Sequence, residues 1–142
     1  YCHYMMQGEF KSSNYANSEY SVNLKGKNIG IIGCGAVGMR VANIMNAFEA
    51  NVLVYDPYAD AKQLEESGYK VVDLEELCKS SDVISVHFRL TKETENMIGE
   101  KEFALMKPTC FFVNTARAGL VDEEALIKAL SQKKLGGAGI DV

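Results

Sequence analysis

Short apolar runs rich in β-branched residues alternate with stretches of helical period from Asn28 onward. The runs that we expect to form strands are 28–33, 51–56, 69–72, 82–87, 109–115 and 137–142. Strands that alternate with helical segments are typical of βαβ units, in which neighbouring strands run parallel. The pattern therefore predicts a parallel sheet with helical crossovers.

The longest helical period follows the first expected strand. Its apolar positions, at helical spacing, are Val37, Val41, Ile44, Met45 and Phe48. A second set with the same spacing comprises Ala125, Leu126, Ala129 and Leu130, preceded by Asp122 as a suitable N-cap. Shorter helices are expected over 59–67, 74–80 and 100–106. We expect both apolar faces to be buried against the sheet.

Six strands joined by right-handed crossovers predict an α/β fold, a Rossmann-type doubly wound parallel sheet in a three-layer α/β/α arrangement with strand order 3-2-1-4-5-6. Residues 1–27 have no sustained period and contain many turn-forming residues, so we interpret them as a connecting segment that leads into a domain over 28–142. The chain starts at Tyr1 and stops inside an expected strand, which suggests a fragment of a longer protein.

Composition excludes several classes of protein. A chain of 142 residues with 47% apolar and 24% charged residues fits one globular domain. The net charge of -4 provides no basic stripe for a nucleic acid, and the chain has neither an 18-residue apolar run nor a signal-peptide pattern. The four cysteines match neither a zinc site nor a disulfide framework. We expect a cytoplasmic protein with no metal, membrane or nucleic-acid partner.

A glycine-rich motif, Gly33-Cys34-Gly35-Ala36-Val37-Gly38, joins the first expected strand to the first helix. Gly33 permits a tight turn, Gly35 lets a pyrophosphate approach the backbone, and Gly38 lets helix and strand pack closely. Ala36 and Val37 would present free amides at the positive end of the helix dipole. The alternative is a turn that only packs a helix on a strand.

An acidic residue, Asp56, ends the second expected strand 18 residues after Gly38. At that place in a Rossmann unit a carboxylate can accept hydrogen bonds from the adenosine ribose, and it would repel a 2′-phosphate. The position therefore favours NAD over NADP. The alternative is a cap within the turn Asp56-Pro57-Tyr58.

Segments along nearly the whole chain resemble the D-2-hydroxyacid dehydrogenase family, which includes phosphoglycerate, glycerate, lactate and formate dehydrogenases. The matching segments are 24–33, 55–58, 81–87, 106–108, 114–126 and 137–142, of which 114–126 is the most specific. The resemblance implies the NAD-binding domain of an oxidoreductase that transfers hydride between NAD and a D-2-hydroxy acid or its 2-oxo counterpart. It also implies a homodimer in the full-length protein.

The resemblance makes Arg117 the catalytic candidate, as the residue that anchors and polarises the substrate. A guanidinium is permanently charged and matches a carboxylate in shape. The alternative is a surface residue paired with Asp122 or Glu123. The resemblance further implies cofactor contacts at Phe88, Thr115, Ala116, Arg117 and Asp141.

Histidine is the usual acid-base group near neutral pH, which draws attention to His87. The resemblance instead implies a structural or cofactor-lining role for His87, because the family's proton donor and its Glu partner lie beyond residue 142. We therefore expect this fragment alone to be inactive. Two positions depart from the family pattern, since Ala118 and Arg89 stand where many members have Gly and Pro.

Two rival functions stay open on the sequence. A non-catalytic NADH-responsive module or corepressor can have the same fold. A domain for another adenosine ligand, such as S-adenosylmethionine, is a weaker alternative.

Overall fold

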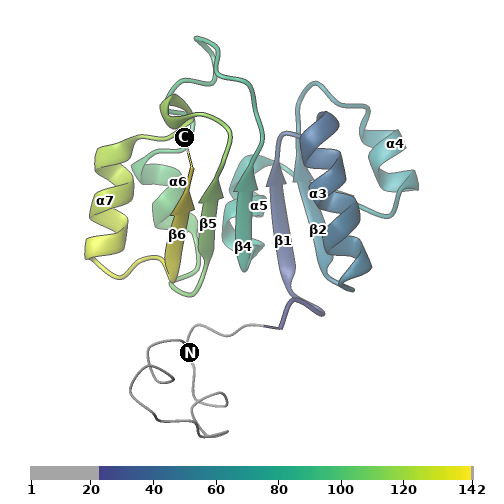
Figure 1. The fold of residues 1–142 in the computed structure, drawn as a ribbon, viewed down its shortest axis with the longest axis horizontal. Helices are drawn as coiled ribbons and strands as arrows, with labels where there is room; N and C mark the ends of the chain where they lie inside the picture. The colour runs from purple at the N-terminus through teal and green to yellow at the C-terminus, as the bar shows by residue number, and fades with distance from the viewer. Residues whose placement is uncertain (1–22, 142) are drawn as a thin grey trace, which may run out of the picture.

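Six parallel strands form one sheet in the computed structural model, which describes residues 23–141 (Figure 1). The strands are β1 (Asn28–Ile32), β2 (Asn51–Tyr55), β3 (Lys70–Val71), β4 (Val83–Val86), β5 (Phe111–Asn114) and β6 (Gly137–Ile140). Their order, β3-β2-β1-β4-β5-β6, confirms the predicted topology. The connecting segment predicted for 1–27 lies, up to residue 22, outside the described residues, so that division of the chain stays a prediction.

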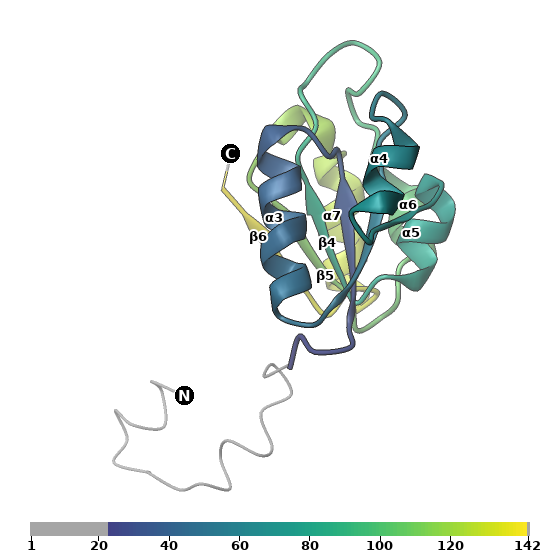
Figure 2. The same ribbon diagram turned by 90° about the vertical axis from the view of Figure 1, so that its right-hand side faces the viewer.

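Helices cover both faces of the sheet and make the three predicted layers (Figure 2). The helices are α3 (Ala36–Ala47), α4 (Ala61–Glu66), α5 (Leu74–Ser80), α6 (Glu100–Leu105), the 3₁₀ turn η1 (Ala118–Leu120) and α7 (Glu123–Ser131). One core joins α3 and α4 to β1 and β2, and the other joins α5, α6 and α7 to β4 and β5. The central strands are apolar on both faces because both faces are covered.

The prediction of which face of α3 is buried is wrong in part. Val37, Ile44 and Phe48 are 63%, 52% and 55% exposed, whereas Gly38 and Ala42 are buried. The helix is thus rotated by about one residue, roughly 100°, from the orientation that its large apolar side chains suggested. Small residues face β1 because the helix packs close to the strand there.

The prediction for α7 is largely confirmed. The Asp122 carboxylate accepts a hydrogen bond from the Ala125 amide at 3.0 Å, so it caps the helix as expected. Leu126 and Ala129 are buried, while Leu130 remains 37% exposed. Capping and the buried face together hold α7 over β5.

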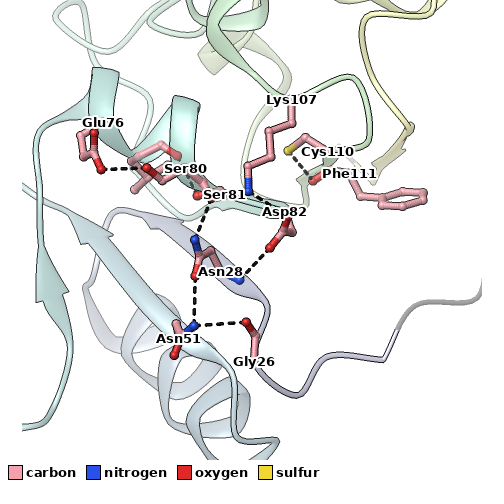
Figure 3. Close-up of polar contacts among 11 residues, drawn as sticks. Gly26, Asn28, Asn51, Glu76, Ser80, Ser81, Asp82, Lys107, Cys110 and Phe111 are labelled. Atoms are coloured by element: carbon pink, nitrogen blue, oxygen red, sulfur yellow. Dashed lines mark hydrogen bonds and ion pairs between the residues drawn. The ribbon is translucent and has the colours of Figure 1, made fainter.

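A polar network ties the strands together at their amino ends (Figure 3). The Asp82 carboxylate accepts hydrogen bonds from the Asn28 amide and from Lys107 Nζ, both at 2.9 Å. The Asn28 side chain donates to the Ser80 carbonyl at 2.9 Å and accepts from Asn51 Nδ2 at 3.1 Å. Asp82 therefore links the start of β1 to the loop before β5.

The environment of Asp82 lowers its pKa. Partial burial opposes ionisation, but the hydrogen bond from Lys107, the Asn28 amide and the charges of Lys107 and Lys27 together outweigh burial. A carboxyl whose pKa is lower in the folded than in the unfolded chain stabilises the fold above its unfolded pKa. That contribution is lost as the pH falls through the folded value.

Replacing Asp82 with Asn should therefore lower the free energy of unfolding by about 1 kcal/mol at pH 7. The difference from wild type should shrink as the pH falls from about 4, where the unfolded carboxyl becomes protonated, through the lower pKa of the folded carboxyl. Urea unfolding at several pH values measures both effects. Glu75→Gln, in the exposed Glu75–Lys79 pair, is the control and should change little. A pH-independent difference for Asp82→Asn would contradict the assigned role.

Candidate functional site

The carboxyl end of β1 turns sharply into α3. Gly33 has a φ of +91°, a conformation that side chains disfavour, and its amide donates to the Tyr55 carbonyl at 2.9 Å. A Cβ on Gly38 would lie 2.0 Å from the Gly33 oxygen, so only glycine lets the helix approach this turn. The first intrahelical bond runs from the Met39 amide to the Gly35 carbonyl. Packing therefore fixes where the first turn of α3 points.

The amides of Ala36 and Val37 donate no hydrogen bond to any other described residue, and no side chain caps α3. Free amides at a helix start attract an anion, and the helix dipole adds to the attraction. The position of Gly35 is open, since a Cβ there would have no atom within 4 Å. A phosphate group could thus approach the loop closely.

Next to this loop lies a cavity of about 490 Å³ that includes the predicted ribose acid. Its lining comprises Gly33, Gly35, Ala36, Val37, Asp56, Tyr58, His87, Phe88, Arg89, Thr91, Glu93 and Thr94. We call it the glycine-loop cavity. The loop amides and the Asp56 carboxylate thus meet in one space, as an adenosine phosphate would require.

Asp56 connects the glycine loop to the turn after β2. One carboxylate oxygen accepts from the Cys34 amide at 2.8 Å and the other from the Tyr58 amide at 2.9 Å. The bond to Tyr58 is the turn cap that the sequence left open as an alternative. Each carboxylate oxygen has a second acceptor position, so the cap leaves room for ribose hydroxyls.

A second cavity, also of about 490 Å³, adjoins the first. Its lining comprises Val37, His87, Phe88, Arg89, Leu90, Thr115, Ala116 and Arg117. We call it the arginine cavity, and it shares Val37, His87, Phe88 and Arg89 with the glycine-loop cavity. The two cavities thus lie side by side along the carboxyl ends of β1, β4 and β5, where ligands of open α/β sheets bind.

Asn114, at the end of β5, shapes the backbone that presents Arg117. Its buried side chain accepts from the Ala116 amide at 3.0 Å and donates to the Arg117 carbonyl at 2.9 Å. The sequence analysis did not assign this role to Asn114. An Asn directly after a strand and before a turn is the signal that could have identified it, because Asn side chains readily bond nearby backbone.

The Arg117 side chain is exposed, and its guanidinium donates to the Ala116 carbonyl at 2.6 Å. Within residues 23–141 no acid lies close enough to form an ion pair with it, so the alternative pairing with Asp122 or Glu123 is not seen. The charge of Arg117 is thus available to a ligand in the arginine cavity. Ala118 lies in η1 without a positive φ, so an alanine there causes no backbone strain.

His87 lines both cavities but is bonded within β4. Its Nε2 lies 2.9 Å from Ser85 Oγ, and burial lowers the pKa of the imidazole. Burial therefore favours the neutral imidazole over the charged one. The neighbouring Phe88 packs edge-on against Tyr55, with ring centroids 6.2 Å apart.

The structure brings most of the predicted site residues together. Gly33, Gly35, Ala36, Val37 and Asp56 line the glycine-loop cavity, Thr115, Ala116 and Arg117 line the arginine cavity, and Phe88 lines both. Gly38 lies beneath the loop, and Asp141 lines neither cavity, although its amide donates to the Asn114 carbonyl at 3.0 Å. The cavity residues that the sequence analysis missed are Tyr58, Leu90, Thr91, Glu93 and Thr94. Their ligand roles stay predictions.

The described part of the chain contains neither a candidate metal-binding group nor a candidate membrane-spanning helix. Among residues 23–141, no three His, Cys, Asp or Glu side chains gather in a group that could hold a metal ion. No helix in the same range is long and apolar enough to span a bilayer.

Residues 2–142 match the model of the D-isomer specific 2-hydroxyacid dehydrogenase family, NAD binding domain. A D-3-phosphoglycerate dehydrogenase of Archaeoglobus fulgidus is 46% identical over 121 residues, which are 85% of this chain and 23% of the relative. A glyoxylate reductase of Thermococcus litoralis is 47% identical over 119 residues, 84% of this chain and 36% of the relative.

Solved structures show the same similarity. The D-lactate dehydrogenase of Aquifex aeolicus, complexed with NAD and lactic acid, matches with a TM-score of 0.90 and 39% identity over 99% of this chain and 41% of that one. The Lactobacillus jensenii D-lactate dehydrogenase with NAD+ matches with a TM-score of 0.83 and 40% identity. The match covers 98% of this chain and 41% of that one. This chain thus spans less than half the length of these relatives.

The geometry of the glycine loop predicts unequal effects of two alanine substitutions. Gly38→Ala should destabilise the fold by about 3 kcal/mol, because its Cβ would overlap the Gly33 carbonyl and force α3 away from β1. Gly35→Ala is the matched control and should stay within about 0.5 kcal/mol of wild type, because its Cβ enters open space. Urea unfolding compares the two variants. Equal stabilities would contradict the close approach of helix and strand.

Proposed function

The chain belongs to the D-isomer specific 2-hydroxyacid dehydrogenase family as its NAD-binding domain, and we propose that its parent protein transfers hydride between NAD and a D-2-hydroxy acid or 2-oxo acid. One observation supports the assignment above all. The free amides at the start of α3 and the Asp56 carboxylate line the same cavity, next to a cavity that contains an unpaired arginine.

The residues present fit the cofactor. In this proposal the amides of Ala36 and Val37 hold the diphosphate, Gly33, Gly35 and Gly38 keep the loop close to it, and Asp56 accepts hydrogen bonds from the adenosine ribose. Asp56 would also repel a 2′-phosphate, which favours NAD over NADP. Bound NAD supplies the hydride chemistry.

Arg117 is the substrate-binding residue of the proposal. Its guanidinium can pair with the carboxylate of a 2-oxo acid and stabilise negative charge on the adjacent carbonyl oxygen. Thr115, Ala116 and Asp141 complete the contacts around the nicotinamide, and Phe88 contacts the cofactor from the loop after β4. Asn114 acts through Arg117, because it fixes the backbone from which the arginine extends.

Proton transfer needs a group that this chain does not supply in the described range. His87 is partly buried, bonded to Ser85 and neutral, which suits a wall of the site better than an acid. We propose that the acid-base histidine and its glutamate belong to another part of the parent protein. The chain alone should then show no turnover of a 2-oxo acid with NADH.

The proposal extends to the assembly and location of the parent protein. We propose a homodimer, which the exposed apolar side chains of Val37, Ile44 and Phe48 on α3 support. Cys34, Cys78 and Cys110 are free and buried, as suits a reducing cytoplasm. The net charge of -4 argues against a nucleic acid as the ligand.

Replacing Asp56 with Asn should weaken NADH binding about tenfold, because the charged acceptor for the ribose is lost. Fluorescence titration of the chain with NADH measures the dissociation constant, with S-adenosylmethionine titrated in parallel. Asp60→Asn is the matched control, since Asp60 caps α4, lines neither cavity, and Asn caps equally well. Absence of NADH binding, or preference for S-adenosylmethionine, would refute the proposed cofactor.

In the full-length protein, Arg117→Gln should lower kcat/KM for a 2-oxo acid by about a hundredfold or more, because the charge that binds and polarises the substrate is lost. Arg117→Lys should restore part of the rate, since it keeps the charge but loses the planar fork. Lys62→Gln, exposed on α4 and outside both cavities, removes the same charge and should react like wild type. Wild-type kinetics for Arg117→Gln would remove Arg117 from the mechanism.

A further inference from the structure

Arg89, directly after the loop residue Phe88, lines both the glycine-loop cavity and the arginine cavity. A side chain that borders both must lie where they meet. The ribose acid Asp56 lines only the first cavity, and Arg117 lines only the second. Arg89 therefore stands between the two halves of the site.

The charge of Arg89 is isolated. Among the described residues that line the glycine-loop cavity, Arg89 is the one Lys or Arg, and the acids are Asp56 and Glu93. Within residues 23–141 no carboxylate forms an ion pair with Arg89, and no hydrogen bond of its guanidinium is seen there. An exposed guanidinium without a protein partner is free to pair with an anionic ligand.

The backbone that presents Arg89 is fixed by its neighbours. The Thr94 hydroxyl, in a buried side chain, donates to the Arg89 carbonyl and accepts from the Thr91 amide, both at 2.8 Å. The Asn96 amide donates to the Gly119 carbonyl at 2.8 Å, which joins this loop to the turn after β5. The guanidinium thus extends from an anchored loop beside the cavities.

We propose that Arg89 binds the diphosphate of the dinucleotide, opposite the free amides of α3. The inference rests on the proposed function: with the ribose at Asp56 and the nicotinamide beside Arg117, the diphosphate crosses the junction that Arg89 borders. A guanidinium there pairs with phosphate oxygens and offsets the acidic charge of Asp56 and Glu93. Since many family members have a proline here, Arg89 adds a charged contact to the amide grip of the glycine loop.

Ligands that differ in phosphate content test the proposal. Arg89→Gln should weaken binding of NADH and ADP to the chain about tenfold, while binding of adenosine changes less than about twofold. Arg89→Lys should retain part of the affinity. The loss in Arg89→Gln should shrink at high salt, since screening weakens an exposed ion pair. Lys134→Gln, beyond α7 and outside both cavities, removes the same charge and should bind like wild type.

Four results would overturn the inference. Unchanged ADP affinity in Arg89→Gln would exclude the contact. An equal loss for adenosine and ADP would place Arg89 against the base instead of the diphosphate. A fall in the melting temperature of Arg89→Gln that matches the loss of binding would make its role structural. Failure of the wild-type chain to bind NADH would overturn the proposed function as well, so the two failures can be told apart.

Discussion

Contact between the backbones of Gly33 and Gly38 determines the arrangement of the whole carboxyl edge of the sheet. The space that a Cβ on Gly38 would need is already taken by the Gly33 oxygen, so α3 starts directly against the end of β1. That position leaves the first amides of the helix free and aims them over the edge of the sheet. The Asp56 carboxylate joins the loop through the Cys34 amide. The close packing of α3 on β1 is therefore what positions the free amides for an anion.

The two ends of the sheet have different tasks. At the amino ends, the Asn28 amide and Lys107 Nζ both donate to the Asp82 carboxylate (Figure 3). These hydrogen bonds stabilise the fold. At the carboxyl ends, Arg89 and Arg117 have no acidic partner in the described range. Unpaired charges and free amides contribute little to stability but are available to a ligand. The separation lets the site change without loss of the fold.

Much of this architecture could be predicted from the sequence. The alternation of strand and helix, with right-handed crossovers, was enough for the strand order, and Asp122 was recognisable as a helix cap from its residue type and place. The orientation of α3 was only partly predictable from its large apolar residues: Val41 and Met45 pack against the core as expected, but the fully buried positions are Gly38 and Ala42. A prediction from the hydrophobic pattern depends mostly on large apolar residues, whereas close packing of a helix on a strand requires small ones. Thr91 and Thr94 were missed as cavity residues because they lie in a loop without a period.

A crystal structure of the chain with bound NAD would test the central claim most directly. The account predicts diphosphate oxygens within hydrogen-bond distance of the Ala36 and Val37 amides, and ribose hydroxyls on the Asp56 carboxylate. A glycine loop without phosphate, or an Asp56 carboxylate turned away from the ribose while NAD binds elsewhere, would contradict it.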